Sequence, residues 1–313
     1  MNLETVLYRV EGAVAVVSMN RTKAMNSLNK QIFADLTVAF EAAKADDAVR
    51  CVVLNAEGRA FCAGGDIAEM KGITTEEAFF DFMSVAGGFT TLLNTFPKPV
   101  ITAAHGAIAG AGTSLLMAGD IALVADNAMF IVAFGQVGLV PDCACHYLLP
   151  RVVGPNIAKE LMLTQRVVKA DEMKELGIAN YVYPAEQLQE EAMKLANKIA
   201  RGPLNCYAAS KAMMNKAHET TLDELLKEET AVQAAVRMHP NAEEGLGAFL
   251  EKRKAAFIQS LDEPRRATGI HTIFIPNEYS TVKIGQCGEN YTALFYYFAE
   301  YIGIFHSPSC IFI

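Results

Sequence analysis

The sequence predicts an α/β fold, because buried strands alternate with helices along most of its length. Short apolar runs at residues 49–54 and 100–104 each lead into a glycine-rich turn and then a helical pattern. Apolar runs of this length are typical of parallel strands that are covered on both faces. The alternation implies right-handed crossovers between parallel strands of one sheet.

The first 125 residues supply most of the strands. Residues 6–10 and 14–19 predict two paired strands around a turn at Glu11-Gly12. Ser27 then precedes a helical pattern with the i, i+4, i+8 spacing of one buried face. The residues that share this spacing are Leu28, Ile32, Phe33, Leu36, Phe40 and Ala43. The same reasoning predicts helices at 75–94 and 113–118 and strands at 100–104 and 121–125.

The later part of the chain is mainly helical. Helices are predicted at 205–217, 222–238 and 241–257, and Gly202-Pro203 marks a boundary before them. These patterns divide the chain into a core (1–200), a helical region (201–258) and a C-terminal extension of unknown role (259–313). The extension is rich in aromatic residues at 291–305, but this stretch is too short for a membrane span of about 20 residues.

Composition narrows the function classes. The 313 residues carry a net charge of −8 and are 52% hydrophobic, which is typical of a globular protein and disfavours nucleic-acid binding. The seven cysteines form no CxxC pair, so reduced thiols are expected. The N-terminus lacks the basic and apolar regions of a secretory signal. We therefore expect a cytoplasmic protein without a membrane span.

Two glycine-rich loops, at residues 58–66 and 105–112, each follow a predicted strand. Small residues let a backbone approach a ligand closely, and the free N–H groups at a helix N-terminus carry partial positive charge. Two such loops side by side could direct two N–H donors at one oxygen, as an oxyanion hole requires. Tight packing alone is the alternative explanation. A dinucleotide fingerprint fails because Leu115 occupies the place of its third glycine.

Seven segments in a fixed order carry a family resemblance. The segments are 20–28, 49–54, 58–66, 105–112, 138–142, 149–151 and 251–257. Together they resemble the enoyl-CoA hydratase/isomerase (crotonase) superfamily over roughly residues 3–258. The resemblance implies a crotonase-type ββα spiral core with a C-terminal helical trimerisation region. It also implies an enzyme of fatty acid metabolism that acts on acyl-CoA thioesters and assembles as a homotrimer or a dimer of trimers.

The resemblance also implies roles for individual residues. Matched by position, the two oxyanion-hole amides belong to Ala63 and Ala111, and no metal is expected. Coenzyme A enters as part of the substrate, with no permanently bound cofactor. The positions that match its binding site are Lys23, Ala24, Ala63, Gly64, Gly65, Asp66, Lys254 and Phe257. For the two lysines, a solvated surface charge remains the alternative.

The reaction depends on the acid and base groups beside the enolate. Ser114 and Phe134 stand where hydratases of this family carry their two glutamates, and neither can act as a base near neutral pH. Asp142 stands where isomerase-type members carry one catalytic carboxylate. A turn or helix cap is the alternative role for Asp142. Cys143, Cys145 and His146 lie beside it, but side chains spaced this way cannot all face one point.

We therefore expect an enoyl-CoA isomerase that moves a double bond from position 3 to position 2, with Asp142 as acid and base. Three alternatives stay open: a hydratase with atypical acid and base residues, a ring-altering isomerase of aromatic acyl-CoA thioesters, and a catalytically silent acyl-CoA-binding member. The acyl chain length cannot be predicted from the pattern.

Overall fold

The computed structural model describes residues 3–257 and divides the chain into two compact units. The first unit, Met1–Asn215, contains both β-sheets. The second begins at Lys216 and contains α10 (Leu222–Arg237) and α11 (Pro240–Leu250). The predicted extension at 259–313 lies outside the described residues. No helix within residues 3–257 is both long and apolar enough to cross a membrane.

The larger sheet has six strands in the order β1-β2-β3-β5-β7-β10. Its first two strands form the predicted antiparallel hairpin, and the remaining neighbours pair in parallel. The strands are β1 (Val6–Glu11), β2 (Val14–Met19), β3 (Cys51–Ala56), β5 (Val100–Ala104), β7 (Ile121–Ala125) and β10 (Tyr181–Tyr183). Every residue of β2, β3 and β5 is buried, which agrees with strands covered on both faces.

The smaller sheet has four short strands in the order β4-β6-β8-β9. They are β4 (Ala60–Cys62), β6 (Ala107–Ala109), β8 (Met129–Ile131) and β9 (Val168–Lys169). Each of the first three follows a strand of the larger sheet directly and precedes a helix. The chain therefore repeats a strand–strand–helix unit, which confirms the predicted ββα spiral.

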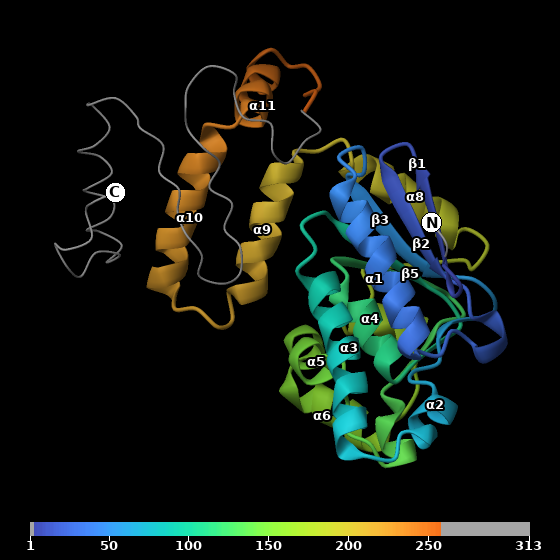
Figure 1. Ribbon diagram of the computed structural model, residues 1–313. Helices are drawn as coiled ribbons and strands as arrows, with labels where there is room; N and C mark the ends of the chain where they lie inside the picture. The colour runs from blue at the N-terminus through green and yellow to red at the C-terminus, as the bar shows by residue number, and fades with distance from the viewer. Residues whose placement is uncertain (1–2, 258–313) are drawn as a thin grey trace, which may run out of the picture. The chain divides into compact units, whose positions relative to one another are not determined.

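Helices cover both faces of the larger sheet (Figure 1). On one face, α8 packs against β2, β3, β5 and β7 through residues such as Leu188, Ala192 and Ala196. On the other, α1, α3 and α4 enclose the main core. The helices of this unit are α1 (Lys30–Ala45), α2 (Ile67–Gly72), α3 (Glu76–Asn94), α4 (Ala111–Ala118), α5 (Cys145–Val153), α6 (Pro155–Thr164), α7 (Ala170–Glu175), α8 (Leu188–Ile199) and α9 (Leu204–Lys216), with 3-10 turns η1 (Thr22–Ala24) and η2 (Ala133–Val137).

Two predicted helix ends were wrong. The first helix begins at Lys30 and not directly after Ser27, because the Asn29 side chain caps it by accepting from the Ile32 amide at 3.0 Å. The last helix ends at Leu250, and Lys252 has a left-handed backbone with φ 55°. The predicted helix to residue 257 is therefore too long, and Lys254 and Phe257 follow α11.

The boundary between the units falls one helix later than the predicted one at residues 200–201. Helix α9 belongs to the first unit up to Asn215. Lys211 on this helix pairs with Asp120 at 2.9 Å, and both side chains are largely buried. The Tyr147 hydroxyl also donates to the Asn215 carbonyl at 2.9 Å. These contacts attach α9 to the α/β core.

Candidate functional site

The two glycine-rich loops lie against each other. The first follows β4, and the second follows β6 and leads into α4. A Cβ atom built on Gly64 would lie 3.2 Å from the Ala109 carbonyl oxygen and 3.5 Å from the Gly110 Cα. Gly110 itself has φ 50°, in the region that favours glycine. A larger residue at either position would push the loops apart.

The amide of Ala63 is already paired, so the prediction that it donates to an oxyanion is wrong. Its N–H donates to the Met25 carbonyl oxygen at 3.0 Å. Farther along the same loop, the Gly64 carbonyl accepts from the Leu28 amide and the Asp66 amide donates to the Leu28 carbonyl. These two bonds form a parallel β-bridge between Leu28 and Gly65, and in such a bridge the N–H of the middle residue, Gly65, points away from Leu28. It has no partner within residues 3–257.

The second available amide is that of Ala111, as predicted. Ala111 is the first residue of α4, and the first N–H groups of a helix have no partner within it. Its N–H makes no hydrogen bond to another described residue, whereas the Thr113 N–H donates back to Gly110 at 2.9 Å. The partial positive charge of the α4 N-terminus is therefore directed outward at Ala111.

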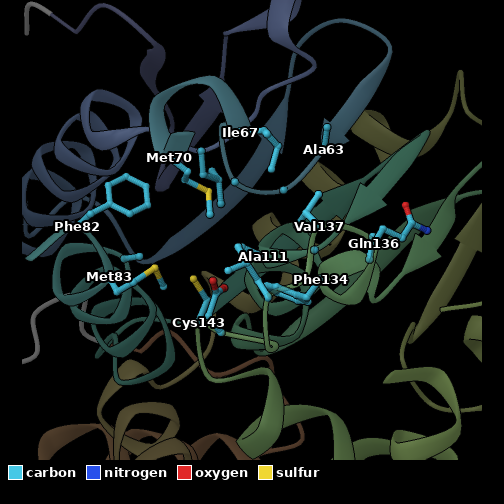
Figure 2. A pocket seen from close by; sticks show the side chains of 18 of the residues that line it. Ala63, Ile67, Met70, Phe82, Met83, Ala111, Phe134, Gln136, Val137 and Cys143 are labelled. Atoms are coloured by element: carbon cyan, nitrogen blue, oxygen red, sulfur yellow. The ribbon is translucent and has the colours of Figure 1, made fainter. Parts of the chain in front are cut away.

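Gly65 and Ala111 both line one cavity of about 180 Å³, which Figure 2 shows with its side chains. Most of the lining is apolar. The lining residues are Leu28, Phe33, Ala63, Gly64, Gly65, Ile67, Met70, Phe82, Met83, Ala86, Gly110, Ala111, Ala133, Phe134, Gln136, Val137, Leu139, Asp142 and Cys143. A mostly apolar cavity with a few convergent polar groups is the usual form of a small-molecule site.

Asp142 contributes the only carboxylate among the described residues that line the cavity. Its Oδ1 is buried and has no hydrogen-bond partner in the described part of the chain. Two bonds hold its backbone carbonyl, because the Ser114 hydroxyl donates to it at 3.1 Å and the Cys145 amide at 2.9 Å. The two residues that follow, Cys143 and Ala144, both have left-handed backbones, with φ 49° and 62°. This turn begins α5 and keeps Asp142 at the cavity wall.

Burial raises the pKa of the Asp142 carboxyl, although the Cys143 thiol and the His146 imidazole act in the opposite direction. A carboxyl that is removed from water holds its proton more tightly because the charged form is poorly solvated. Burial, with the nearby Asp142 charge, also raises the pKa of Cys143. The thiol is therefore neutral at pH 7, which disfavours a nucleophilic role.

The predicted coenzyme A residues fall into two places. Lys23 and Ala24 form part of η1, where Lys23 is exposed. The segment after η1 bonds to the first loop, since Met25 accepts from the Ala63 amide and the Leu28 amide donates to Gly64. Lys254 and Phe257 lie in the second unit, so their role stays a prediction.

Asp66 has a structural role that the sequence reasoning missed. Its Oδ1 accepts from the Ala68 and Glu69 amides at 3.1 and 3.2 Å and caps α2. Its Oδ2 accepts from the Arg21 guanidinium at 2.8 Å. Although burial favours the neutral form, these donors hold the pKa of Asp66 below its usual value. Asp66 thus orders the segment directly after Gly65.

The other polar residues near Asp142 do not form a second reactive cluster. Cys145 is buried and His146 is exposed, so the two side chains do not share one surface. Residues 3–257 contain no group of three His, Cys, Asp or Glu side chains arranged to hold a metal ion. The His105 ring lies 2.8 Å from the Gly58 carbonyl oxygen and joins the ends of the two loops.

Comparison with known proteins matches this chain to one family and to named members of it. Residues 9–260 match the model of the family described as enoyl-CoA hydratase/isomerase. The 1,2-epoxyphenylacetyl-CoA isomerase of Escherichia coli K12 is 36% identical over 82% of this chain and 98% of its own length. The crotonyl-CoA hydratase of Syntrophomonas wolfei is 35% identical over 82% of this chain and 99% of its own.

The structural comparison agrees with the sequence comparison. The crystal structure of an enoyl-CoA hydratase from Polaromonas sp. JS666 superposes with a TM-score of 0.79 at 30% sequence identity. The match covers 81% of this chain and 99% of that chain.

Proposed function

Because the chain belongs to the enoyl-CoA hydratase/isomerase (crotonase) family, we propose that it is an enoyl-CoA isomerase with Asp142 as its acid and base. The observation that carries this proposal is that Asp142 is the single carboxylate among the described residues lining the cavity. Asp142 Oδ1 is buried without a described partner, in the same cavity as the Gly65 and Ala111 amides.

The two amides supply the step that the reaction needs first. A thioester carbonyl oxygen that accepts from the Gly65 and Ala111 N–H groups is stabilised when it gains negative charge. Such stabilisation makes the adjacent C2–H acidic enough for a carboxylate to remove its proton. Removal of one oxyanion-hole donor typically lowers the rate by about 10²–10³, so each of the two amides is expected to contribute strongly to the rate.

Asp142 then completes the double-bond shift. Its carboxylate takes a proton from C2 of a 3-enoyl thioester, and the electron pair delocalises onto the carbonyl oxygen and the C3–C4 double bond. Return of a proton from the Asp142 carboxyl to C4 leaves a double bond between C2 and C3. No atom is gained or lost. The raised pKa of Asp142 suits both proton transfers, the removal from C2 and the return to C4. A group whose pKa is closer to the working pH transfers protons more efficiently in both directions.

Hydration would need a second group that activates water, and the described lining offers none. Ser114 is fully buried, and its hydroxyl is occupied with the Asp142 carbonyl. Phe134 adds a phenyl ring to the cavity wall and cannot move a proton. This arrangement favours a proton shift over addition of water.

Coenzyme A enters this proposal as part of the substrate, and no permanently bound cofactor is needed. Lys23 is an exposed cation beside the segment that bonds to the first loop. A lysine there can interact with the phosphates of the nucleotide while the thioester reaches Gly65. Ala24 leaves room for the nucleotide on the same turn.

A ring-altering isomerase of aromatic acyl-CoA thioesters is the second candidate. The observation that favours it is the 36% identity to the isomerase of E. coli K12 that is named for 1,2-epoxyphenylacetyl-CoA. The same two amides and the same carboxylate would serve this reaction.

The test offers 3-hexenoyl-CoA, 2-hexenoyl-CoA and 1,2-epoxyphenylacetyl-CoA separately to the purified full-length protein and identifies the products. The proposal expects conversion of the first to 2-hexenoyl-CoA and little 3-hydroxyhexanoyl-CoA from the second. Turnover of the epoxide alone would establish the second candidate. Rapid formation of the hydroxy product from 2-hexenoyl-CoA would contradict the isomerase proposal.

A further inference from the structure

The described residues that line the cavity include no lysine or arginine. Among the described residues that line it, the ionisable side chains are Asp142 and Cys143, and Gln136 offers the only side-chain amide. A carboxylate at the far end of an acyl group would lose its hydration without gaining a partner, and it would also face Asp142. Burial of an unpaired charge is strongly unfavourable. The lining therefore disfavours binding of acyl groups that carry a carboxylate at their far end.

The volume of the cavity is a guide to the size of the acyl group that can be buried in it. At about 180 Å³ it is slightly larger than the engineered apolar cavity of about 150 Å³ that binds benzene. The thioester carbonyl must occupy part of this space beside the Gly65 and Ala111 amides. The remaining room fits about six carbons, as a chain or as one ring.

The floor of the cavity is backed by packed aromatic rings. Phe33 lines it, and its ring lies 6.1 Å from the ring of Phe89. Phe89 in turn packs edge to face on Phe40, and Phe40 on Phe96. Displacing close-packed rings of this kind to make room for a longer chain would cost free energy, because their packing contacts would be lost.

Phe82 is the residue placed to limit length. Figure 2 shows Phe82 and Ala63 at opposite sides of the cavity, so Phe82 stands away from the loop that holds the thioester. Its ring is buried, and the centroid of that ring lies 6.2 Å from the centroid of the Phe79 ring. Met70 and Met83 also line the cavity, and their flexible thioethers can pack against a bent chain or a ring.

We propose, on the basis of the function above, that the cavity accepts neutral acyl groups of about six carbons, excludes those with a terminal carboxylate, and is limited in length by Phe82. These limits on the charge and length of the acyl group apply whichever proton moves in the reaction.

Binding of saturated, unreactive thioesters tests it. The affinities of full-length protein for hexanoyl-CoA, glutaryl-CoA and decanoyl-CoA are measured by titration calorimetry. We expect hexanoyl-CoA to bind at least tenfold more tightly than either of the others. Glutaryl-CoA is the matched probe for charge, and decanoyl-CoA is the probe for length. Equal affinity for hexanoyl-CoA and either probe would overturn the inference.

Variants at Phe82 test the length limit. Phe82→Ala is expected to tighten decanoyl-CoA binding at least tenfold while glutaryl-CoA stays excluded, and Phe82→Leu serves if the alanine variant does not fold. Phe80→Ala is the control, because Phe80 is exposed on the same helix and does not line the cavity. An unchanged decanoyl-to-hexanoyl ratio in the folded Phe82 variant would overturn the role of Phe82. If none of the thioesters binds, the proposed function fails as well, whereas uniform binding overturns only this inference.

Discussion

Asp142 combines a cost in folding stability with the acid–base role that we propose for it. Its carboxyl is drawn away from water, its Oδ1 has no described partner, and two backbone bonds fix its position. A buried polar atom without a partner is unfavourable for folding. If the cavity binds a thioester as proposed, the same atom is free to accept a proton.

The pKa of Asp142 gives a stability prediction with a definite sign. Burial raises the pKa in the folded protein above the unfolded value of about 3.9. Between these two values the folded protein holds a proton that the unfolded chain has released. Stability therefore falls as pH rises through this window, and the loss stays constant above it. The cost is about 1.4 kcal/mol for each pKa unit.

We expect Asp142→Asn to remove this cost. Its melting temperature should exceed that of the wild type at pH 7, and the difference should disappear near pH 3, where both side chains are neutral. Calorimetric melting across this range checks the prediction. Identical melting temperatures at pH 7 would show that the carboxylate is not penalised by burial.

Single-residue roles were the least predictable part of the site. The sequence indicated the loop that supplies the first amide, but it could not show that Ala63 donates to Met25. That bond depends on how residues 20–28 cross the loop, which is a tertiary contact. The bridge between Leu28 and Gly65 then leaves the Gly65 N–H without a partner among the described residues. Asp142, by contrast, was predicted from the family resemblance, and the structure puts it in the wall of the cavity.

At the scale of elements, the junction of β4 with α4 sets the distance between the two loops. Gly112 lies in the first turn of α4, against the last residue of β4. A Cβ atom on Gly112 would lie 2.7 Å from the Cys62 carbonyl oxygen and 3.0 Å from its Sγ. The contact is with backbone, so the helix itself would have to shift.

Gly112→Ala should therefore destabilise the protein by about 1–3 kcal/mol through overpacking. It should also lower kcat, because a shifted α4 carries the Ala111 amide with it. Gly87→Ala is the matched control: Gly87 lies inside α3 with nothing within 4 Å of an added Cβ. That change should stabilise the protein by about 0.5–1 kcal/mol. Equal effects of the two substitutions in chemical denaturation would contradict the packing argument.

Elements with a strong pattern were predicted well, and short ones were missed. The strands at 100–104 and 121–125 were placed correctly because their apolar runs are bounded by turns. The smaller sheet went unrecognised, since its strands have two or three residues and too few positions to show alternation. The last helix was extended too far because nothing in its pattern marks the left-handed turn at Lys252.

At the scale of the whole molecule, the second unit is short of buried contacts. Helix α10 buries none of its residues, although its sequence is amphipathic. Several large apolar side chains of this unit are exposed, namely Leu222, Leu226, Met238, Leu246, Phe249 and Leu250. Such a number of large exposed apolar side chains in one small unit favours an interface between subunits.

We expect this surface to assemble the protein into a trimer or a dimer of trimers. Light scattering on the purified protein should give three or six times the chain mass of 33.9 kDa. The double variant Leu226→Asp, Phe249→Asp should give a smaller mass in the same measurement, because two charged side chains would replace two exposed apolar ones. A wild-type mass of one chain at every concentration would contradict this prediction.

The family match ends at residue 260, so the remaining residues should be dispensable for the reaction. Deletion of residues 261–313 should leave kcat and KM for 3-hexenoyl-CoA within about twofold, since the cavity is lined by residues 28–143. A tenfold loss of kcat in a soluble, correctly assembled truncation would show that the extension contributes to the site.

The most direct test of the central claim compares wild type with Asp142→Asn in the conversion of 3-hexenoyl-CoA. Loss of the only described carboxylate in the cavity should reduce kcat by about 10²–10⁴, the usual contribution of a general acid or base. The affinity for hexanoyl-CoA should stay within about threefold, because the Gly65 and Ala111 amides that we propose to hold the carbonyl are unchanged. Isomerisation by Asp142→Asn at the wild-type rate would contradict the account.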